Sequence, residues 1–137
     1  LFLTKKKAGT ELIWDFKDCP DLAQTVFPVC AAKGITGTFT GLESLRIKET
    51  DRIAALQNEL GKIGATLTET DAGCWTLVPG KVSGEEITIN TYHDHRMAMG
   101  LAPLATLTNL KIESPEVVNK SYPGFWDDMR SVGFEIR

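Results

Sequence analysis

Residues 46 to 52 carry five charged side chains in seven positions, in the order Arg46-Ile47-Lys48-Glu49-Thr50-Asp51-Arg52. Directly after them, apolar residues recur at three- and four-residue steps, at Ile53, Leu56, Leu60 and Ile63. This spacing predicts an amphipathic helix that ends at Gly64 and whose polar face carries Gln57, Asn58, Glu59 and Lys62. Thr50 is the expected N-cap, which leaves the charged residues beside unpaired backbone N–H groups that suit an anion. The alternative is a solvated helix start with surface salt bridges.

The same patterns predict the other elements. A strand is expected at 12–16, a helix at 22–33 that Pro28 kinks or opens by one turn, and a strand at 35–40. After the helix at 53–63, a hairpin joins strands at 65–68 and 74–78. The order then begins again, with strands at 87–91, 110–113 and 134–136 and helices at 95–107 and 123–131. The sequence therefore predicts an α/β fold built from an internal repeat.

The repeat has a register that can be checked. Asp21 precedes Pro28 by seven positions, and Arg96 precedes Pro103 by seven. Where helices pack back on a sheet through right-handed crossovers, their N-termini gather at one end of the layer. Four junctions would then meet there, with Asp21 at the first, Lys48, Glu49 and Arg52 at the second, His95 and Arg96 at the third, and Lys120 at the fourth. Such a face suits an anion, and Asp21, Glu49 and His95 are candidates for proton transfer.

Composition narrows the class of protein. At 137 residues with 42% hydrophobic and 24% charged residues, the chain is one domain's worth of sequence. A net charge of −3 argues against a nucleic-acid binder, and the sequence shows no membrane span. Three cysteines without metal-type spacing predict reduced thiols and a cytoplasmic protein. The start at Leu1 suggests a piece of a longer protein, and Lys5 to Lys7 are expected to form a solvated loop.

Two chemical signals are weak. The pair His93 and His95, without a nearby cysteine, is a poor metal signal, so no metal or cofactor is expected. The sequence contains neither a Gly-rich phosphate loop of the common patterns nor a nucleophile elbow.

Four motifs carry a resemblance to a known family. These are RIKETDR at 46–52, DHRMAM at 94–99, PDLAQT at 20–25 and NKSYPGFW at 119–126. They resemble motifs of 5-enolpyruvylshikimate-3-phosphate synthases, in that family's order and spacing, from about Trp14 to the end of the chain. The resemblance implies a C-terminal fragment of an inside-out barrel domain built from βαβαββ units, each a mixed sheet with helices on one side. Unit one would span about 10–80 and unit two about 84–137.

The resemblance also implies a reaction, in which the 5-hydroxyl of shikimate 3-phosphate receives the enolpyruvyl group of phosphoenolpyruvate. Asp21 is similar to the carboxylate that deprotonates this hydroxyl, and Glu49 to the group that exchanges a proton at C3. Arg52 and Arg96 resemble carboxylate-binding arginines. The other substrate contacts implied are Lys48 on the shikimate side, Lys120 at the phosphoenolpyruvate phosphate, and His95 beside them.

Three further expectations follow. Ser44 stands where some members of the family have asparagine, so its role stays open. The partner of this chain would be the remaining N-terminal part of the same enzyme, and the isolated chain would be inactive. The alternatives are a UDP-N-acetylglucosamine enolpyruvyl transferase, or a non-enzymatic anion-binding module of the same fold.

Overall fold

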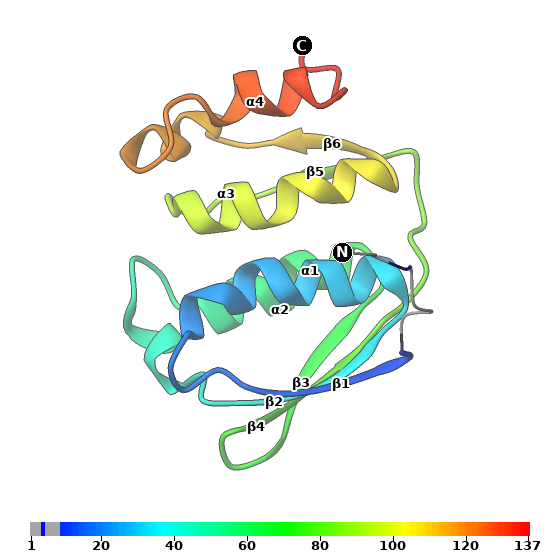
Figure 1. Ribbon diagram of the computed structural model, residues 1–137, viewed down its shortest axis with the longest axis vertical. Helices are drawn as coiled ribbons and strands as arrows, with labels where there is room; N and C mark the ends of the chain where they lie inside the picture. The colour runs from blue at the N-terminus through cyan, green and yellow to red at the C-terminus, as the bar shows by residue number, and fades with distance from the viewer. Residues whose placement is uncertain (1–3, 5–8) are drawn as a thin grey trace.

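The structure is a computed structural model that describes residues 4 and 9–137. The loop expected at Lys5 to Lys7 lies outside the described residues. The first half of the chain forms β1 (Glu11–Asp15), α1 (Ala23–Lys33), β2 (Thr36–Thr40), α2 (Arg52–Lys62), β3 (Thr66–Asp71) and β4 (Cys74–Val78). The strands make one sheet in the order β1-β2-β4-β3, in which β1 and β2 are parallel and the other pairs antiparallel. Figure 1 shows α1 and α2 on one face of this mixed sheet.

The second half forms a smaller layer. Its elements are β5 (Glu86–Ile89), α3 (His95–Leu101), β6 (Asn109–Ile112) and α4 (Phe125–Ser131), with two 3-10 helices, η3 (Ala102–Thr106) and η4 (Pro115–Lys120). Strands β5 and β6 pair in parallel. In Figure 1, α3 lies between the α1–α2 layer and the β5–β6 pair, and α4 lies beyond that pair. The α/β class and the mixed sheet predicted from sequence are therefore confirmed.

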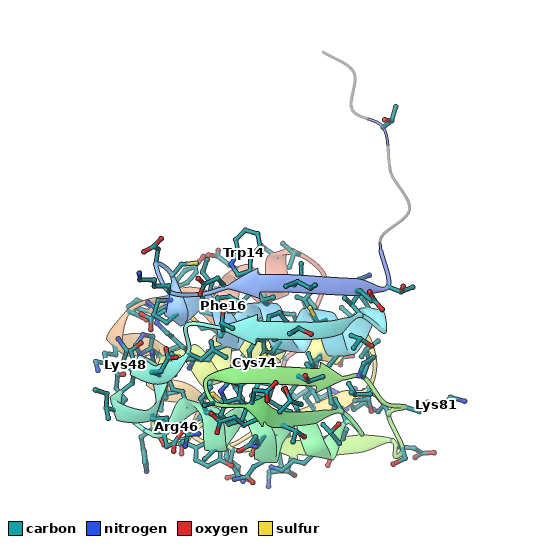
Figure 2. All side chains as sticks on the ribbon, turned by 90° about the horizontal axis from the view of Figure 1, so that it is seen from below. Trp14, Phe16, Arg46, Lys48, Cys74 and Lys81 are labelled. Atoms are coloured by element: carbon teal, nitrogen blue, oxygen red, sulfur yellow. The ribbon has the colours of Figure 1, made fainter. Side chains whose placement is uncertain are left out.

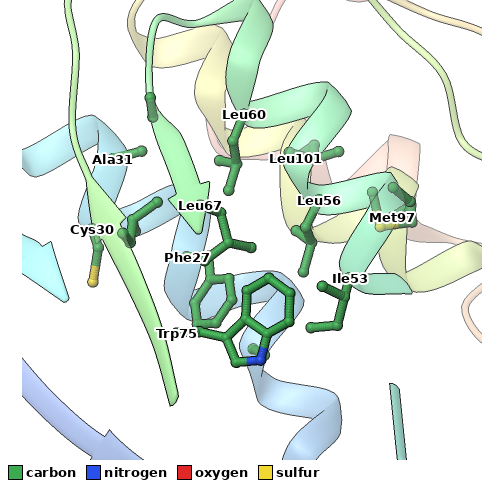
Figure 3. Close-up of a cluster of buried hydrophobic side chains, with 14 of the residues drawn as sticks. Phe27, Cys30, Ala31, Ile53, Leu56, Leu60, Leu67, Trp75, Met97 and Leu101 are labelled. Carbon is green, nitrogen blue, oxygen red and sulfur yellow. The ribbon is translucent and has the colours of Figure 1, made fainter. Parts of the chain in front are cut away.

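The predicted apolar stripe of α2 forms the centre of the core. Ile53, Leu56, Leu60 and Ile63 are all at most 2% exposed. Figure 3 shows the first three of them beside Trp75 and Leu67 of the sheet, Phe27 of α1, and Met97 and Leu101 of α3. One continuous core therefore joins the two halves of the chain.

The structure corrects two predictions about α2. Its N-cap is Asp51, whose Oδ1 accepts a hydrogen bond from the Ala54 N–H at 3.0 Å, because the helix begins one residue later than a Thr50 cap requires. Glu59, predicted on the solvated face, is fully buried, since the segment before α3 packs over that face. The predicted stop at Gly64 is confirmed by its left-handed φ of 77°.

The predicted match between the positions of the two prolines is wrong, and one predicted strand does not form. Helix α1 runs unbroken through Pro28, whereas α3 ends at Leu101 and Pro103 falls in η3. Pro28 has no N–H to offer the Gln24 carbonyl one turn earlier, and Gly100 of α3 packs against that carbonyl. The strand expected at 134–136 is absent, because no neighbouring strand lies there to complete a ladder.

Candidate functional site

The N-termini of α1, α2 and α3 lie at the same end of the molecule, as Figure 1 shows. Asp21 lies in η1 (Pro20–Leu22), a 3-10 turn directly ahead of α1. Lys48 and Glu49 follow η2 (Glu43–Ile47), and Arg52 is the first residue of α2. His95 and Arg96 open α3, and Lys120 ends η4. Figure 2 shows Lys48 at the opposite end of the sheet from Lys81.

Arg52 is the centre of this end of the molecule, with a side chain only 2% exposed. Its Nε and Nη2 donate to Asp94 at 2.6 and 3.3 Å, in a two-pronged contact. Its Nη1 donates to Asp21 at 2.9 Å, and its Nη2 also donates to Glu49 at 2.8 Å. A planar guanidinium fork can reach several carboxylates at once, which a lysine ammonium on a flexible stem does less well. Arg52 therefore ties three separate junctions together.

Three more cations lie around the two outer carboxylates. Lys48 and Arg96 reach Asp21 at 3.7 and 3.3 Å, and Lys120 reaches Glu49 at 3.3 Å. Unlike Arg52, these side chains are partly exposed, at 34% for Lys48, 39% for Arg96 and 63% for Lys120. The cluster thus holds four cations against three carboxylates. Its outer cations lie partly at the surface, where an added anion can reach them.

The structure thus brings six of the seven predicted site residues into one ion-pair network and places the seventh differently. His95 is 9% exposed, makes no ion pair, and its Nδ1 has no hydrogen-bond partner among the described residues. It opens α3 next to Arg96. A buried imidazole nitrogen without a partner is available to a group that enters the site.

Sequence reasoning assigned no role to Asp94, although this residue is central. Asp94 is completely buried, caps α3 through a 2.8 Å hydrogen bond from the Arg96 N–H, and holds Arg52. An aspartate directly before the first residue of a predicted helix is an N-cap signal, which could have marked it. Its contact with Arg52, 42 positions away, left no trace in a single sequence.

The electrostatic setting acts most strongly on Glu49. A hydrogen bond from its own backbone N–H, the hydrogen bond from Lys120 and the nearby Arg52 charge together lower the pKa of Glu49 to about 2. Burial opposes this shift but does not overcome it. Glu49 is therefore a carboxylate at neutral pH.

Other features of the described chain lie apart from this cluster. Two surface pockets lie near Gly84, Asn109 and Phe134, by the C-terminal end of η3. Over residues 4 and 9–137 no group of three or more His, Cys, Asp and Glu side chains has an arrangement suited to a metal ion. Within the same residues no helix has the length and apolar character needed to cross a membrane.

Comparison with known proteins identifies the family. The sequence pattern of EPSP synthase (3-phosphoshikimate 1-carboxyvinyltransferase) matches residues 4–129. The chain belongs to the EPSP synthase family. Among curated members, the 3-phosphoshikimate 1-carboxyvinyltransferase of Bacteroides fragilis is 47% identical, with 96% of this chain and 33% of that protein covered. The enzyme of the same name from Clostridium kluyveri is 38% identical, with 93% and 30% covered.

The fold of a solved EPSP synthase agrees with this assignment. The structure from Acinetobacter baumannii superposes with a TM-score of 0.71 at 28% identity, over 88% of this chain and 30% of that one. The chain therefore spans about one third of the length of the relatives that it matches. The family resemblance predicted from the four motifs is confirmed.

Proposed function

We propose that this chain supplies one wall of an active site that transfers the enolpyruvyl group of phosphoenolpyruvate to the 5-hydroxyl of shikimate 3-phosphate. Two observations support the proposal. The chain belongs to the EPSP synthase family over most of its length, and its charged residues converge on Arg52 at one end of the molecule. The convergence carries the argument, since both substrates are anions that need clustered cations.

In this proposal the partly exposed cations hold the substrates. Arg96 offers a two-pronged donor set to the carboxylate of phosphoenolpyruvate, while Lys120 offers a point charge to its phosphate. Lys48 contacts Oδ1 of Asp21, whereas Arg96 contacts Oδ2, and Lys48 would contact shikimate 3-phosphate. Each of these cations is held in the free chain by Asp21 or Glu49, so substrate anions would compete with carboxylates that are already in place.

Arg52 has a more restricted part. Three carboxylates occupy its donors, so it can share a substrate carboxylate with Arg96 only if Asp21 or Glu49 turns away. Asp21 and Glu49 would both turn toward the substrates to carry protons in the proposed reaction, which would free donors of Arg52 for a substrate carboxylate. His95, with an unpartnered buried Nδ1, would line the same site.

The proposed chemistry needs two proton carriers. As the 5-hydroxyl oxygen bonds to C2 of phosphoenolpyruvate, its proton passes to Asp21, while C3 takes a proton from Glu49. Glu49 then removes a proton from C3 as the bond between C2 and the phosphate oxygen breaks, which restores the double bond. The proton held by Asp21 passes to the departing phosphate, so both carboxyl groups return to their starting states. Glu49 must be protonated before the first step. If Lys120 turns to the substrate phosphate, Glu49 loses the hydrogen bond from Lys120. That bond lowers the pKa of Glu49 more than any other interaction except the one with its own backbone N–H, so the pKa of Glu49 rises.

The wider setting is part of the same proposal. We propose that residues 10–80 and 84–137 are two βαβαββ-type units of an inside-out barrel domain. The second unit, which has strands β5 and β6 only, would be completed by other parts of the protein. The remaining part of the enzyme would provide the facing wall of the cleft. We propose a cytoplasmic location, which the three unpaired cysteines fit.

The alternatives stand differently. The matching family pattern is that of EPSP synthase, so the UDP-N-acetylglucosamine enolpyruvyl transferase is set aside. A non-enzymatic anion-binding module would use the same cations without turnover. Assays of two proteins distinguish this module from the enzyme. One is the 137-residue chain, and the other is a chimera in which this chain replaces the matching third of the Bacteroides fragilis relative.

The test is phosphate release from phosphoenolpyruvate that depends on shikimate 3-phosphate. We expect none from the chain alone, because positioning needs both walls of the cleft, and steady turnover from the chimera. Lys120→Met should abolish most of that turnover, whereas Lys111→Met should not. These two lysines are matched, with side chains 63% and 62% exposed and each paired with a glutamate. A folded but inactive chimera, or equal effects of the two substitutions, would overturn the proposal.

A further inference from the structure

Helix α2 buries a second charged residue that the candidate site does not use. Glu59 lies seven positions after Arg52, two helical turns along the same face, and is 0% exposed. A buried carboxylate is costly unless it is paired and hydrogen-bonded, so its partners show what it holds in place.

The partners of Glu59 come from the segment that leads into α3. Its Oε1 accepts from the Tyr92 hydroxyl at 2.7 Å, and its Oε2 accepts from the Asn90 backbone N–H at 3.1 Å. Lys62 lies 2.6 Å from Oε2 and donates to the Thr88 carbonyl at 2.9 Å. Burial raises the pKa of the Tyr92 hydroxyl and the bond to Glu59 raises it further, so Tyr92 remains the donor.

These contacts form a series along α2. Lys62 holds residue 88, Glu59 holds residues 90 and 92, and Arg52 holds Asp94. The helix and the segment 88–94 therefore run in opposite directions and are joined at both ends and in the middle. Side chains of one helix thus fix the path of the chain into the candidate site.

The segment needs such support because of its backbone. Tyr92 and His93 both have φ of 56°, the left-handed region that bulky side chains rarely adopt. Such residues persist only where the surrounding structure holds them, and they gather at functional sites. Directly after them come Asp94, His95 and Arg96, so the turn sets where the cap of α3 and both substrate-side residues point.

We infer that Glu59 is a positioning residue of the candidate site, which through Tyr92 and Asn90 holds the left-handed turn that aims Asp94 at Arg52 and Arg96 at the substrates. The backbone effect is independent of any activity. The catalytic consequence rests on the proposed function, so the test has one arm for each.

The first arm uses the 137-residue chain and hydrogen exchange measured by NMR. The two reporters are the Arg52 Nε–H, which donates to Asp94, and the Asp94 backbone N–H, which donates to the Thr91 carbonyl. Tyr92→Phe removes one hydrogen bond to Glu59, and Glu59→Gln replaces one acceptor oxygen by a donor that faces Asn90 or Lys62. Each should speed exchange at both reporters by on the order of tenfold, the effect of losing a hydrogen bond to a charged group.

The control is Tyr122→Phe, which also removes a hydroxyl that is bound to a carboxylate. Tyr122 lies on the exposed segment before α4, and its hydroxyl donates to Asp128 of α4. This substitution should leave both reporters unchanged. Exchange within about twofold of wild type in Tyr92→Phe, well below the cost of such a bond, would overturn the inference. If Glu59→Gln does not fold, Tyr92→Phe alone decides.

The second arm measures steady-state kinetics of the chimera. Tyr92→Phe should lower kcat/KM for phosphoenolpyruvate by several-fold, with a larger effect on KM than on kcat, because Arg96 is misaimed while both proton carriers, Asp21 and Glu49, are still present. Faster exchange in the first arm with an inactive parent chimera would contradict the proposed function and leave the positioning role standing. Unchanged exchange in a chain whose chimera is active would reject the positioning role alone.

Discussion

Arg52 Nε and Asp94 Oδ2 lie 2.6 Å apart in the interior, and this contact joins the first turn of α2 to the N-terminal cap of α3. The two side chains are 2% and 0% exposed. Because Asp94 also receives the Arg96 N–H, one carboxylate contacts both a buried arginine and a partly exposed one. The charged end of the molecule is thus built around a buried ion pair, with partly exposed cations around it.

Asp94→Asn tests the buried pair. The substitution keeps the shape but removes the charge that Arg52 needs, and breaking a buried ion pair costs about 3 kcal/mol or more. We expect the free energy of unfolding in urea to fall by about that amount. The control is Asp127→Asn, whose carboxylate pairs with Arg130 and is 82% exposed. It should cost about 1 kcal/mol or less, and equal losses would contradict the central role of Asp94.

The acidity of Glu49 gives a pH prediction. Its pKa is about 2 in the folded chain against an ordinary 4.5, so folding favours the carboxylate. The resulting stabilisation is fully present above the ordinary value and is lost as pH falls toward 2. A carbon-detected NMR titration of the Glu49 carboxyl group should give this low pKa. Lys120→Met should raise it, since the Lys120 hydrogen bond is a leading cause, whereas Lys111→Met should leave it unchanged.

The roles proposed for Arg52 and Glu49 predict that one variant affects binding and the other affects turnover. In the chimera, Arg52→Lys keeps the charge but loses the planar fork, so KM for phosphoenolpyruvate should rise. Glu49→Gln cannot carry a proton and should mainly lower kcat, on the order of a hundredfold or more. Steady-state kinetics with phosphoenolpyruvate as the varied substrate separates the two. If Glu49→Gln stays within about twofold of the parent, the proton-transfer role is wrong.

The contact of α1 with α3 gives a stability prediction with a matched glycine. A Cβ at Gly100 would lie 2.1 Å from the Gln24 carbonyl oxygen, so Gly100→Ala must push the helices apart. Overpacking of this kind costs about 1–3 kcal/mol. Gly61 lies in α2 with no atom near its Cβ position, so Gly61→Ala should stabilise the chain by about 0.5 kcal/mol. Thermal unfolding of the two variants should shift in opposite directions.

Several of these features were predictable from sequence because they depend on neighbours along the chain. The apolar stripe of α2 follows from helical spacing, and the end at Gly64 follows from the left-handed conformation that glycine adopts easily. The convergence of Asp21, Glu49, Arg96 and Lys120 followed from topology, since the strand-helix order is the same in both halves of the chain and α1, α2 and α3 begin at one end of the molecule. The motifs that name the family are likewise local stretches of sequence.

Two of the wrong predictions have separate causes, one local and one tertiary. The Thr50 cap was displaced by one residue, because a neighbouring aspartate competes for the same backbone N–H groups. The strand at 134–136 had a suitable pattern but no partner, and a strand exists only when another strand pairs with it. A pattern of side chains cannot by itself show which segment will lie alongside it.

The sequence alone determined the family, the helical face of α2 and the end of the molecule where charges collect. The tertiary structure alone decided that Arg52 and Glu59 are buried, that Asp94 holds Arg52, and that Tyr92 takes a left-handed turn. Whether a charged residue faces water depends on what packs over it from 31 to 42 positions away. The energy of such a contact depends on two segments together, so it cannot be read from either segment alone.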